Sequence, residues 1–207
     1  MFRGEFSYNE TVRIPLFPLN TVLFPGGPLP LRIFEARYID MISERMQKDA
    51  PFGVVLIKEG QEAGPASTYE IGTLARFTDW YQGSDGLLGI TAIGEQRFRL
   101  LSVERQADGL NVGQVELLPV EEPVALPEEY RKIAHILGGV LDDLGRLYSS
   151  LERNYDDAGW VTYRFVEVLP IDLEQKQACL EHSTPIERLQ LVSDLLDSVR
   201  SSTDAPN

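Results

Sequence analysis

The sequence has very few residues of the kinds that bind metals or form disulfides. It contains one cysteine, Cys179, and two histidines, His135 and His182. A single cysteine excludes an intramolecular disulfide framework, and we expect a buried, unreactive thiol in a reducing compartment. One cysteine and two histidines are too few for a usual zinc site, so we expect no bound metal and structural or surface roles for both histidines.

Sequence motifs of the common enzyme classes are absent as well. There is no GxxxxGK(S/T) phosphate-binding loop, and no GxGxxG, HExxH, GxSxG or CxxC motif. These motifs carry nucleotide binding, metallopeptidase, serine hydrolase and thiol redox chemistry. We therefore expect no catalytic residues and no cofactor. A self-standing hydrolase is one alternative hypothesis for function. It requires a pocket with coupled titratable groups.

The chain also lacks a long hydrophobic run that could cross a membrane as a helix. The longest apolar-rich stretch without charge, residues 14–31, is interrupted by five prolines and two adjacent glycines. Proline removes a backbone donor, and unpaired backbone groups are not tolerated inside a bilayer. No basic and apolar leader stands at the N-terminus. We expect a soluble cytoplasmic protein with no membrane partner.

Positive charge is scarce relative to negative charge. The net charge is −13, which argues against nucleic acid as the main ligand, because binding to phosphates rewards clustered Lys and Arg. One set of residues nevertheless interleaves basic and aromatic side chains as single-strand binders do: Arg76, Arg97, Phe98, Arg99 and Arg105. RNA binding is therefore the second hypothesis, and it predicts a contiguous basic face.

The first half of the chain has the pattern of strands and turns. Residues 12–16 alternate as in a half-buried strand, and their proline favours an edge position. Residues 25–27 predict a turn, after which residues 29–31 resume the alternation. Residues 34–48 have the spacing of one amphipathic helix. The apolar side chains of the opening stretch are predicted to lie in the core: Leu16, Leu19, Val22, Leu29 and Leu31.

Four further strands follow this helix in the sequence. They are predicted at residues 53–57, 72–82, 87–105 and 110–119, with a polar loop at 59–70. Hairpin turns are predicted at residues 83–86 and 107–109, and Gly94 predicts a bulge or bend. Many curved strands with hairpin turns predict an α+β fold. Its first domain, residues 1–120, is expected to be a mixed β-barrel with one inserted helix.

The second half of the chain has helical periodicity. Residues 121–127 have the composition of a linker, and an apolar stripe from Tyr130 to Leu151 predicts one long helix. Gly138 and Gly139 lie in its middle, where glycine is unfavourable, so we expect a close packing contact there. Residues 160–169 predict another helix. The pattern indicates a C-terminal α-helical bundle domain over residues 121–207.

Two more helix starts are indicated by capping boxes, in which an N-cap side chain and a residue three positions later bond each other's backbone. Asp172 with Gln175 predicts the first, and Thr184 with Glu187 predicts the second. The last helix would place Ile186, Leu189 and Val192 on one apolar stripe.

Several linked segments resemble one known family. They are IPLFPLNTVLFPGGPLPLRIFEARYIDMI, FGVVLI, EIGTLARF, GITAIGEQRFRLLSV and, in the helical half, LPIDLEQKQACLEHSTPIERLQLVSDLL. In this order they look like the N-terminal substrate-binding domain of the ATP-dependent Lon protease, and they also resemble the related domain of cereblon-like proteins. The resemblance covers essentially the whole chain. It implies a barrel of the PUA-like type followed by helices.

The resemblance also implies a function without catalysis. Lon proteases continue into an ATPase module and a serine–lysine peptidase, and neither is expected in this chain, so a peptidase S16 label would describe ancestry. We expect a polypeptide-recognition module whose partners are unfolded or extended polypeptide segments or another protein. The candidate binding residues flank the strand-to-helix corner and a hairpin tip: Arg32, Glu35, Arg37, Tyr38, Trp80 and Tyr81.

Overall fold

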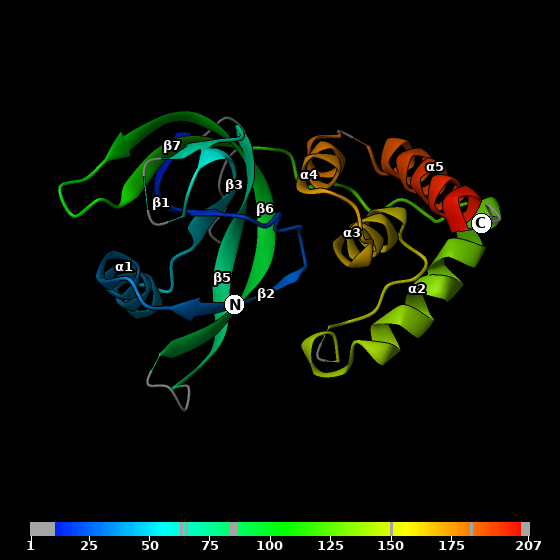
Figure 1. Ribbon diagram of the computed structural model, residues 1–207, viewed down its shortest axis with the longest axis horizontal. Helices are drawn as coiled ribbons and strands as arrows, with labels where there is room; N and C mark the ends of the chain where they lie inside the picture. The colour runs from blue at the N-terminus through cyan, green and yellow to red at the C-terminus, as the bar shows by residue number, and fades with distance from the viewer. Residues whose placement is uncertain are drawn as a thin grey trace. The chain divides into compact units, whose positions relative to one another are not determined.

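A computed structural model describes residues 11–62, 64, 66–82, 87–149, 151–182 and 184–203. The chain divides into two compact units, Met1–Val120 and Glu121–Asn207, whose elements are labelled in Figure 1. Among the described residues, no helix is both long and apolar enough to span a membrane.

The first unit contains seven strands and one helix among its described residues. In chain order these are β1 (Thr11–Leu19), β2 (Pro28–Ile33), α1 (Ala36–Gln47), β3 (Phe52–Gly60), β4 (Ala66–Thr68), β5 (Ile71–Gln82), β6 (Leu88–Arg105) and β7 (Asn111–Leu117). The expected mixture of strands and one inserted helix is therefore present. The predicted turn at residues 83–86 lies outside the described residues.

The strands of the first unit pair along a path that returns to its start. The order is β1-β7-β6-β5-β3-β4, and β1 pairs in addition with β3. The β1–β3 pair is parallel, with Leu16 opposite Gly53, whereas β1 and β7 are antiparallel. β2 lies off this path and pairs with β6 alone. The sheet is thus mixed, and β2 forms an edge beside α1.

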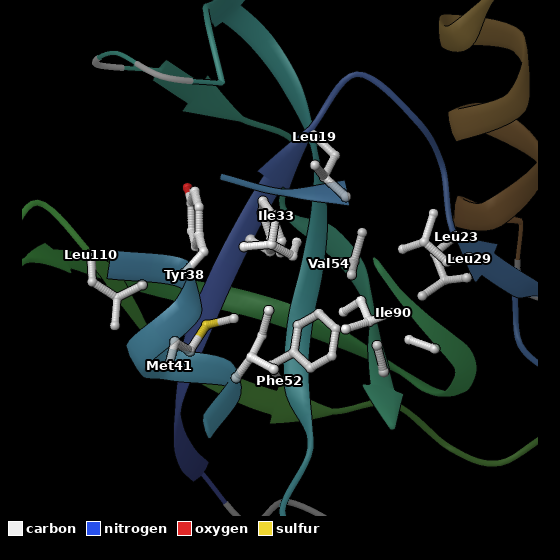
Figure 2. Packing of buried hydrophobic residues seen from close by; sticks show 14 residues of the cluster. Leu19, Leu23, Leu29, Ile33, Tyr38, Met41, Phe52, Val54, Ile90 and Leu110 are labelled. Carbon is white, nitrogen blue, oxygen red and sulfur yellow. The ribbon is translucent and has the colours of Figure 1, made fainter. Parts of the chain in front are cut away.

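Large apolar side chains from the opening stretch and α1 fill the core of the first unit (Figure 2). Phe17 stacks on Tyr38 with ring centroids 4.0 Å apart, and Phe52 stacks on Phe77 at 4.8 Å. The residues predicted to lie in the core are buried, except that Leu31 is half-buried. Burial of these side chains is the main stabilising contribution to this unit.

Gly94 of β6 marks an irregularity in the sheet, as predicted. The pairing of β5 with β6 shifts between Thr73 and Ala75, which lies opposite Gly94. The backbone of Gly94 also bonds the turn after β1: its N–H donates to Gly27 O at 2.9 Å, and its carbonyl accepts from Gly26 N–H at 2.7 Å. A Cβ at Gly94 would lie 2.2 Å from the Phe24 carbonyl oxygen. Only glycine fits this approach.

Two local predictions for the first unit differ from the structure. Residues 59–70 were expected to form a loop, but β3 extends to Gly60 and β4 pairs with it, Gly60 lying opposite Ala66. Backbone pairing there outweighs the polar composition. The helix α1 begins at Ala36, not at Phe34, since its N-cap residue Glu35 is still in extended conformation.

The second unit contains helices α2 (Arg131–Asp143), α3 (Ala158–Val168), α4 (Leu173–Glu181) and α5 (Pro185–Thr203), with short 3-10 turns η1 (Glu128–Tyr130) and η2 (Gly145–Leu147). α3 packs against α2, α4 and α5, and most of its residues are buried. Both capping boxes are confirmed. The Asp172 carboxylate accepts from Gln175 N–H at 2.7 Å, and the Glu187 carboxylate accepts from Thr184 N–H at 3.1 Å.

The prediction of one long helix up to Leu151 is wrong. α2 ends at Asp143, and Gly145 adopts φ +63°, a left-handed conformation that ends helices and that favours glycine. A Cβ at Gly138 would lie 3.4 Å from the Tyr155 hydroxyl, so the expected close packing is found there, whereas nothing lies within 4 Å at Gly139. The stripe on α5 buries Leu189 and Val192 but leaves Ile186 exposed.

The predicted linker 121–127 is held along the start of α3. Leu126 N–H donates to the Asp156 carbonyl at 2.8 Å, and Ala158 N–H donates to the Val124 carbonyl at 2.8 Å. Asp157 is the N-cap of α3 and accepts from Gly159 N–H at 3.1 Å. The linker composition therefore corresponds to an ordered segment of the second unit.

Candidate functional site

A groove of about 480 Å³ runs along β2 and the start of α1 in the first unit. Its apolar lining comes mainly from Phe17, Leu19, Leu29, Leu31, Ile33 and Phe34, and its polar lining from Asn20, Thr21, Arg32, Glu35, Tyr38 and Glu62. An apolar concavity with a few polar groups is the usual form of a ligand site.

Prolines shape the side of the groove formed by β2. β2 pairs with β6 in the register Pro30 opposite Thr91. Proline has no N–H, so Pro28 and Pro30 occupy the positions of the ladder that point away from β6. The outer edge of β2 consequently lacks two donors. A strand is poorly accommodated on such an edge, and the groove offers side-chain contacts instead.

Tyr38 brings an unused hydroxyl to this groove. Its side chain is only 3% exposed, and its ring is fixed by the stack on Phe17. Burial raises the pKa of Tyr38 above its usual value, so the hydroxyl remains a donor at neutral pH. Within the described residues, the hydroxyl has no hydrogen-bond partner, and it points away from α1 (Figure 2). A hydroxyl of this kind at a groove wall can donate to an acceptor on a ligand.

Arg37 and Glu35 support the groove wall. Arg37 Nη1 donates to the Gly109 carbonyl at 2.7 Å, and Nη2 donates to the Glu62 carbonyl at 3.1 Å. Nη2 also lies 2.7 Å from Glu35 Oε2. The Glu62 carboxylate in turn accepts from Asn20 N–H at 2.7 Å. These bonds tie α1 to two loops, so Arg37 serves chiefly to position the groove.

Arg32 lines the groove from β2, and the last two candidates, Trp80 and Tyr81, lie on β5. Arg32 is opposite Gly89 of β6, and Gly89 is opposite Tyr81 of β5. A Cβ at Gly89 would lie 2.3 Å from the Tyr81 ring, so this ring covers the space that the glycine leaves. Paired residues share a face of the sheet, which brings Arg32 and Tyr81 together. Trp80, opposite Ile90, belongs to the other face.

The groove residues that were not sequence-based candidates include Phe34 and Glu62. The spacing of residues 34–48 predicts that Phe34 is part of the helix, but it lies before α1 and is 68% exposed. Glu62 lies in a segment with no motif, and only its contacts reveal it. The exposed aromatic residues Trp80 and Tyr81 were correctly expected to face water, at 61% and 52%.

The alternative sites suggested by the sequence have less support in the geometry. Phe98 is completely buried and Arg97 nearly so, and Arg76 is paired with Glu95 at 2.6 Å. Phe98 is therefore unable to stack on a base. Cys179 is buried, and this burial raises the pKa of its thiol to about 11. Among the described residues, no group of three or more His, Cys, Asp or Glu side chains is placed to hold a metal ion.

Comparison with known sequences identifies one family along nearly the whole chain. Residues 13–198 match the family described as the ATP-dependent protease La (LON) substrate-binding domain. Lon protease 2 of Myxococcus xanthus is 29% identical over 195 residues, which are 90% of this chain and 24% of that protein. Protein cereblon of Xenopus tropicalis is 32% identical over 52% of this chain and 24% of its own length. The chain thus spans about a quarter of these relatives.

Solved structures agree with the family match. The crystal structure of a Lon N-terminal domain protein from Xanthomonas campestris has a TM-score of 0.75 and 31% identity, and the match covers 88% of this chain and 98% of that one. The N-terminal domain of a Lon protease from the Mycobacterium avium complex has a TM-score of 0.61 at 17% identity, with coverage of 88% and 97%. The latter likeness concerns the fold alone.

Proposed function

The chain belongs to the family of ATP-dependent protease La (LON) substrate-binding domains, and we propose that it is a noncatalytic module that recognises unfolded or extended segments of other polypeptides. The proposal includes a cytoplasmic location. It also includes the division into a PUA-like β-barrel domain, residues 1–120, and a helical bundle domain, residues 121–207.

The observation that carries this proposal is the groove along β2. Its apolar side chains offer burial to the side chains that an unfolded polypeptide exposes, and each buried methylene contributes about 0.8 kcal/mol. The Tyr38 hydroxyl supplies one donor for a main-chain carbonyl of the bound segment. Arg32 and Tyr81 extend the contact surface along the sheet next to the groove.

Phe34 is the residue that contributes most to binding in this proposal. It is a large aromatic side chain at the rim of the groove, and its exposed area is available for burial by a ligand. Aromatic side chains of this kind dominate the binding energy of many interfaces. Trp80 lies on the face of the sheet opposite to that of Tyr81, together with Ile90 and the groove residue Leu31.

A binding titration tests the proposal. The purified chain is titrated against fluorescently labelled, reduced and carboxymethylated α-lactalbumin, a permanently unfolded polypeptide, and anisotropy is recorded. We expect Phe34→Ala to weaken binding about tenfold and Tyr38→Phe to weaken it several-fold, because a single hydrogen bond contributes about 1 kcal/mol. Ile186→Ala removes another exposed apolar side chain, 38% exposed, from α5 and should leave binding unchanged.

The thermal midpoint of Tyr38→Phe should equal that of the parent chain, since the hydroxyl has no partner within the described residues. Equal affinity of the Phe34→Ala variant and the parent chain would remove the groove from the proposal. Hydrolysis of the labelled polypeptide by the purified chain alone would contradict the noncatalytic function.

A further inference from the structure

One edge of β6 has no neighbouring strand in the described part of the chain. β5 accompanies β6 only as far as Arg99, which lies opposite Ile71. β6 continues beside β7 to Arg105. Residues 101–105 therefore have a strand on one side only, and the β6–β7 hairpin projects beyond the neighbouring strands (Figure 1).

The register of this hairpin determines which backbone groups face the open side. Gln106 N–H donates to the Leu110 carbonyl at 2.8 Å, so this pair is hydrogen-bonded. Bonded and non-bonded pairs alternate in an antiparallel ladder. Arg105 opposite Asn111 and Val103 opposite Gly113 are consequently non-bonded pairs. The N–H and C=O groups of Val103 and Arg105 point away from β7, toward the open side.

This edge of β6 differs from the outer edge of β2 because it keeps its backbone N–H donors. β2 carries Pro28 and Pro30 at its outward positions, whereas residues 101–105 contain no proline. Proteins usually protect strand edges with proline, charge or cover. Here two large apolar side chains are left half-exposed, Leu101 at 52% and Val103 at 49%. The edge thus has both the donors and the apolar surface that an added strand requires.

A cavity of about 360 Å³ lies along the same edge. It is lined by Leu16, Ser67, Thr68, Leu101 and Val103, among others. This cavity can accept an apolar side chain of a bound segment next to Val103.

Arg105 adds a charge preference to the edge. An added Cβ at Gly109 would lie 3.3 Å from Arg37 Nη1 and 3.4 Å from Arg105 Nη2, so the two guanidinium groups flank this glycine. Arg37 is balanced by Glu35. No carboxylate of the described residues forms an ion pair with Arg105. The local charge therefore favours an acidic side chain on whatever binds here.

We propose that residues 101–105 of β6 bind an extended segment of another polypeptide as an added strand. The segment carries an apolar residue that packs on Val103 and, two positions away, an acidic residue that pairs with Arg105. The ligand class rests on the proposed function, but the surface is separate from the groove along β2. Main-chain hydrogen bonds supply affinity, and the two side chains supply selectivity.

A short fluorescent peptide that carries valine and, two positions later, glutamate, with threonine between and around them, serves as the probe, because residues two apart share one face of an added strand. Binding is measured by anisotropy with the full chain. Methylation of backbone nitrogens at alternate positions of the peptide should weaken binding about tenfold in one register and leave it unchanged in the other, because only every second N–H of an added strand faces β6. Equal effects in both registers would overturn the proposal.

Two variants of the protein complete the test. Val103→Pro removes one outward donor without breaking a bond to β7, and it should weaken binding about tenfold while the circular dichroism spectrum is unchanged. Arg105→Glu should weaken binding of the glutamate peptide and strengthen binding of a matched peptide that carries lysine in place of glutamate. Lys132→Glu on α2 makes a similar charge change in the second unit and should affect neither peptide. If the Arg105→Glu variant bound neither peptide, Arg105 would have only a structural role.

The experiments distinguish the proposal for the groove along β2 from the proposal for the edge of β6. If Phe34→Ala weakens binding of the unfolded α-lactalbumin while Val103→Pro and the methylated peptides show no effect, strand addition is excluded and the proposed function stands. If the unfolded protein does not bind but the alternating peptide does so in the expected register, the proposed function fails and the edge site remains.

Discussion

Arg188 of α5 and Glu121, the first residue of the second unit, form a buried two-bond ion pair. Arg188 Nη1 donates to Glu121 Oε1 at 2.6 Å, and Nη2 bonds Oε2. The guanidinium lies 4.1 Å from the centre of the Tyr163 ring, and the Tyr163 hydroxyl donates to the same carboxylate at 3.0 Å. The side chain of Arg188 is fully buried. Three segments of the second unit, residue 121, α3 and α5, are thereby held together.

Removal of one partner from this pair should destabilise the second unit strongly. Glu121→Gln or Arg188→Met leaves the remaining group buried without its counter-charge, and such changes typically cost about 3–5 kcal/mol. The free energy of unfolding of the double variant should fall by much less than the sum of the decreases in the two single variants. Urea unfolding followed by circular dichroism measures the three free energies. Additive losses would show that the two residues do not act as a pair.

Glu167 of α3 should make stability depend on pH. Its carboxylate accepts from Arg164 Nη2 at 2.7 Å, but burial prevails and raises the pKa of Glu167 from 4.5 to about 7. Between these values the folded chain holds a proton that the unfolded chain has released. The contribution of Glu167 is therefore fully present below pH 4.5 and is lost as the pH rises through about 7.

Comparison with Glu167→Gln isolates this group from other carboxyl groups. The free energy of unfolding of the parent chain minus that of the variant should fall by on the order of 3 kcal/mol between pH 5 and 8. Urea titrations at several pH values measure this difference. A difference that is constant over the range would contradict the raised pKa.

Substitution of alanine for glycine at two positions should change the stability of the chain in opposite directions. Gly94→Ala places a methyl group 2.2 Å from the Phe24 carbonyl oxygen, a backbone atom, so we expect a loss of about 3 kcal/mol or more. Gly139→Ala lies in the middle of α2 with nothing within 4 Å, and it should stabilise the chain by about 1 kcal/mol. Thermal unfolding provides both values. An unchanged midpoint for Gly94→Ala would show that the turn after β1 can move.

Cys179 should be unreactive in the folded chain. Burial raises the pKa of its thiol to about 11, although the nearby Arg188 lowers it. Only the thiolate is alkylated, so reaction with iodoacetamide at pH 8 should be at least ~100-fold slower in the folded chain than in urea. Mass spectrometry of the time course measures the two rates. Equal rates would mean that α4 opens readily.

The sequence by itself determined the features that depend on neighbouring residues. The capping boxes at Asp172 and Thr184 follow from interactions within a few positions, and such local preferences survive in the fold. The alternation predicted for residues 12–16 is not kept, because Ile14, Pro15 and Leu16 are all buried in β1. The family resemblance likewise followed from the order of segments. The end of α2 was missed because the apolar spacing continues past Gly145, while the left-handed conformation of that glycine ends the helix.

Tertiary structure alone decided the candidate sites. The parallel pairing of β1 with β3, the row formed by Arg32, Gly89 and Tyr81, and the open edge at Val103 each join residues that are distant in sequence. No local periodicity encodes which strands become neighbours or in which register. The Tyr38 hydroxyl faces the groove for the same reason: its ring position is fixed by contact with Phe17, and contacts across the core are set by the packing of the whole unit.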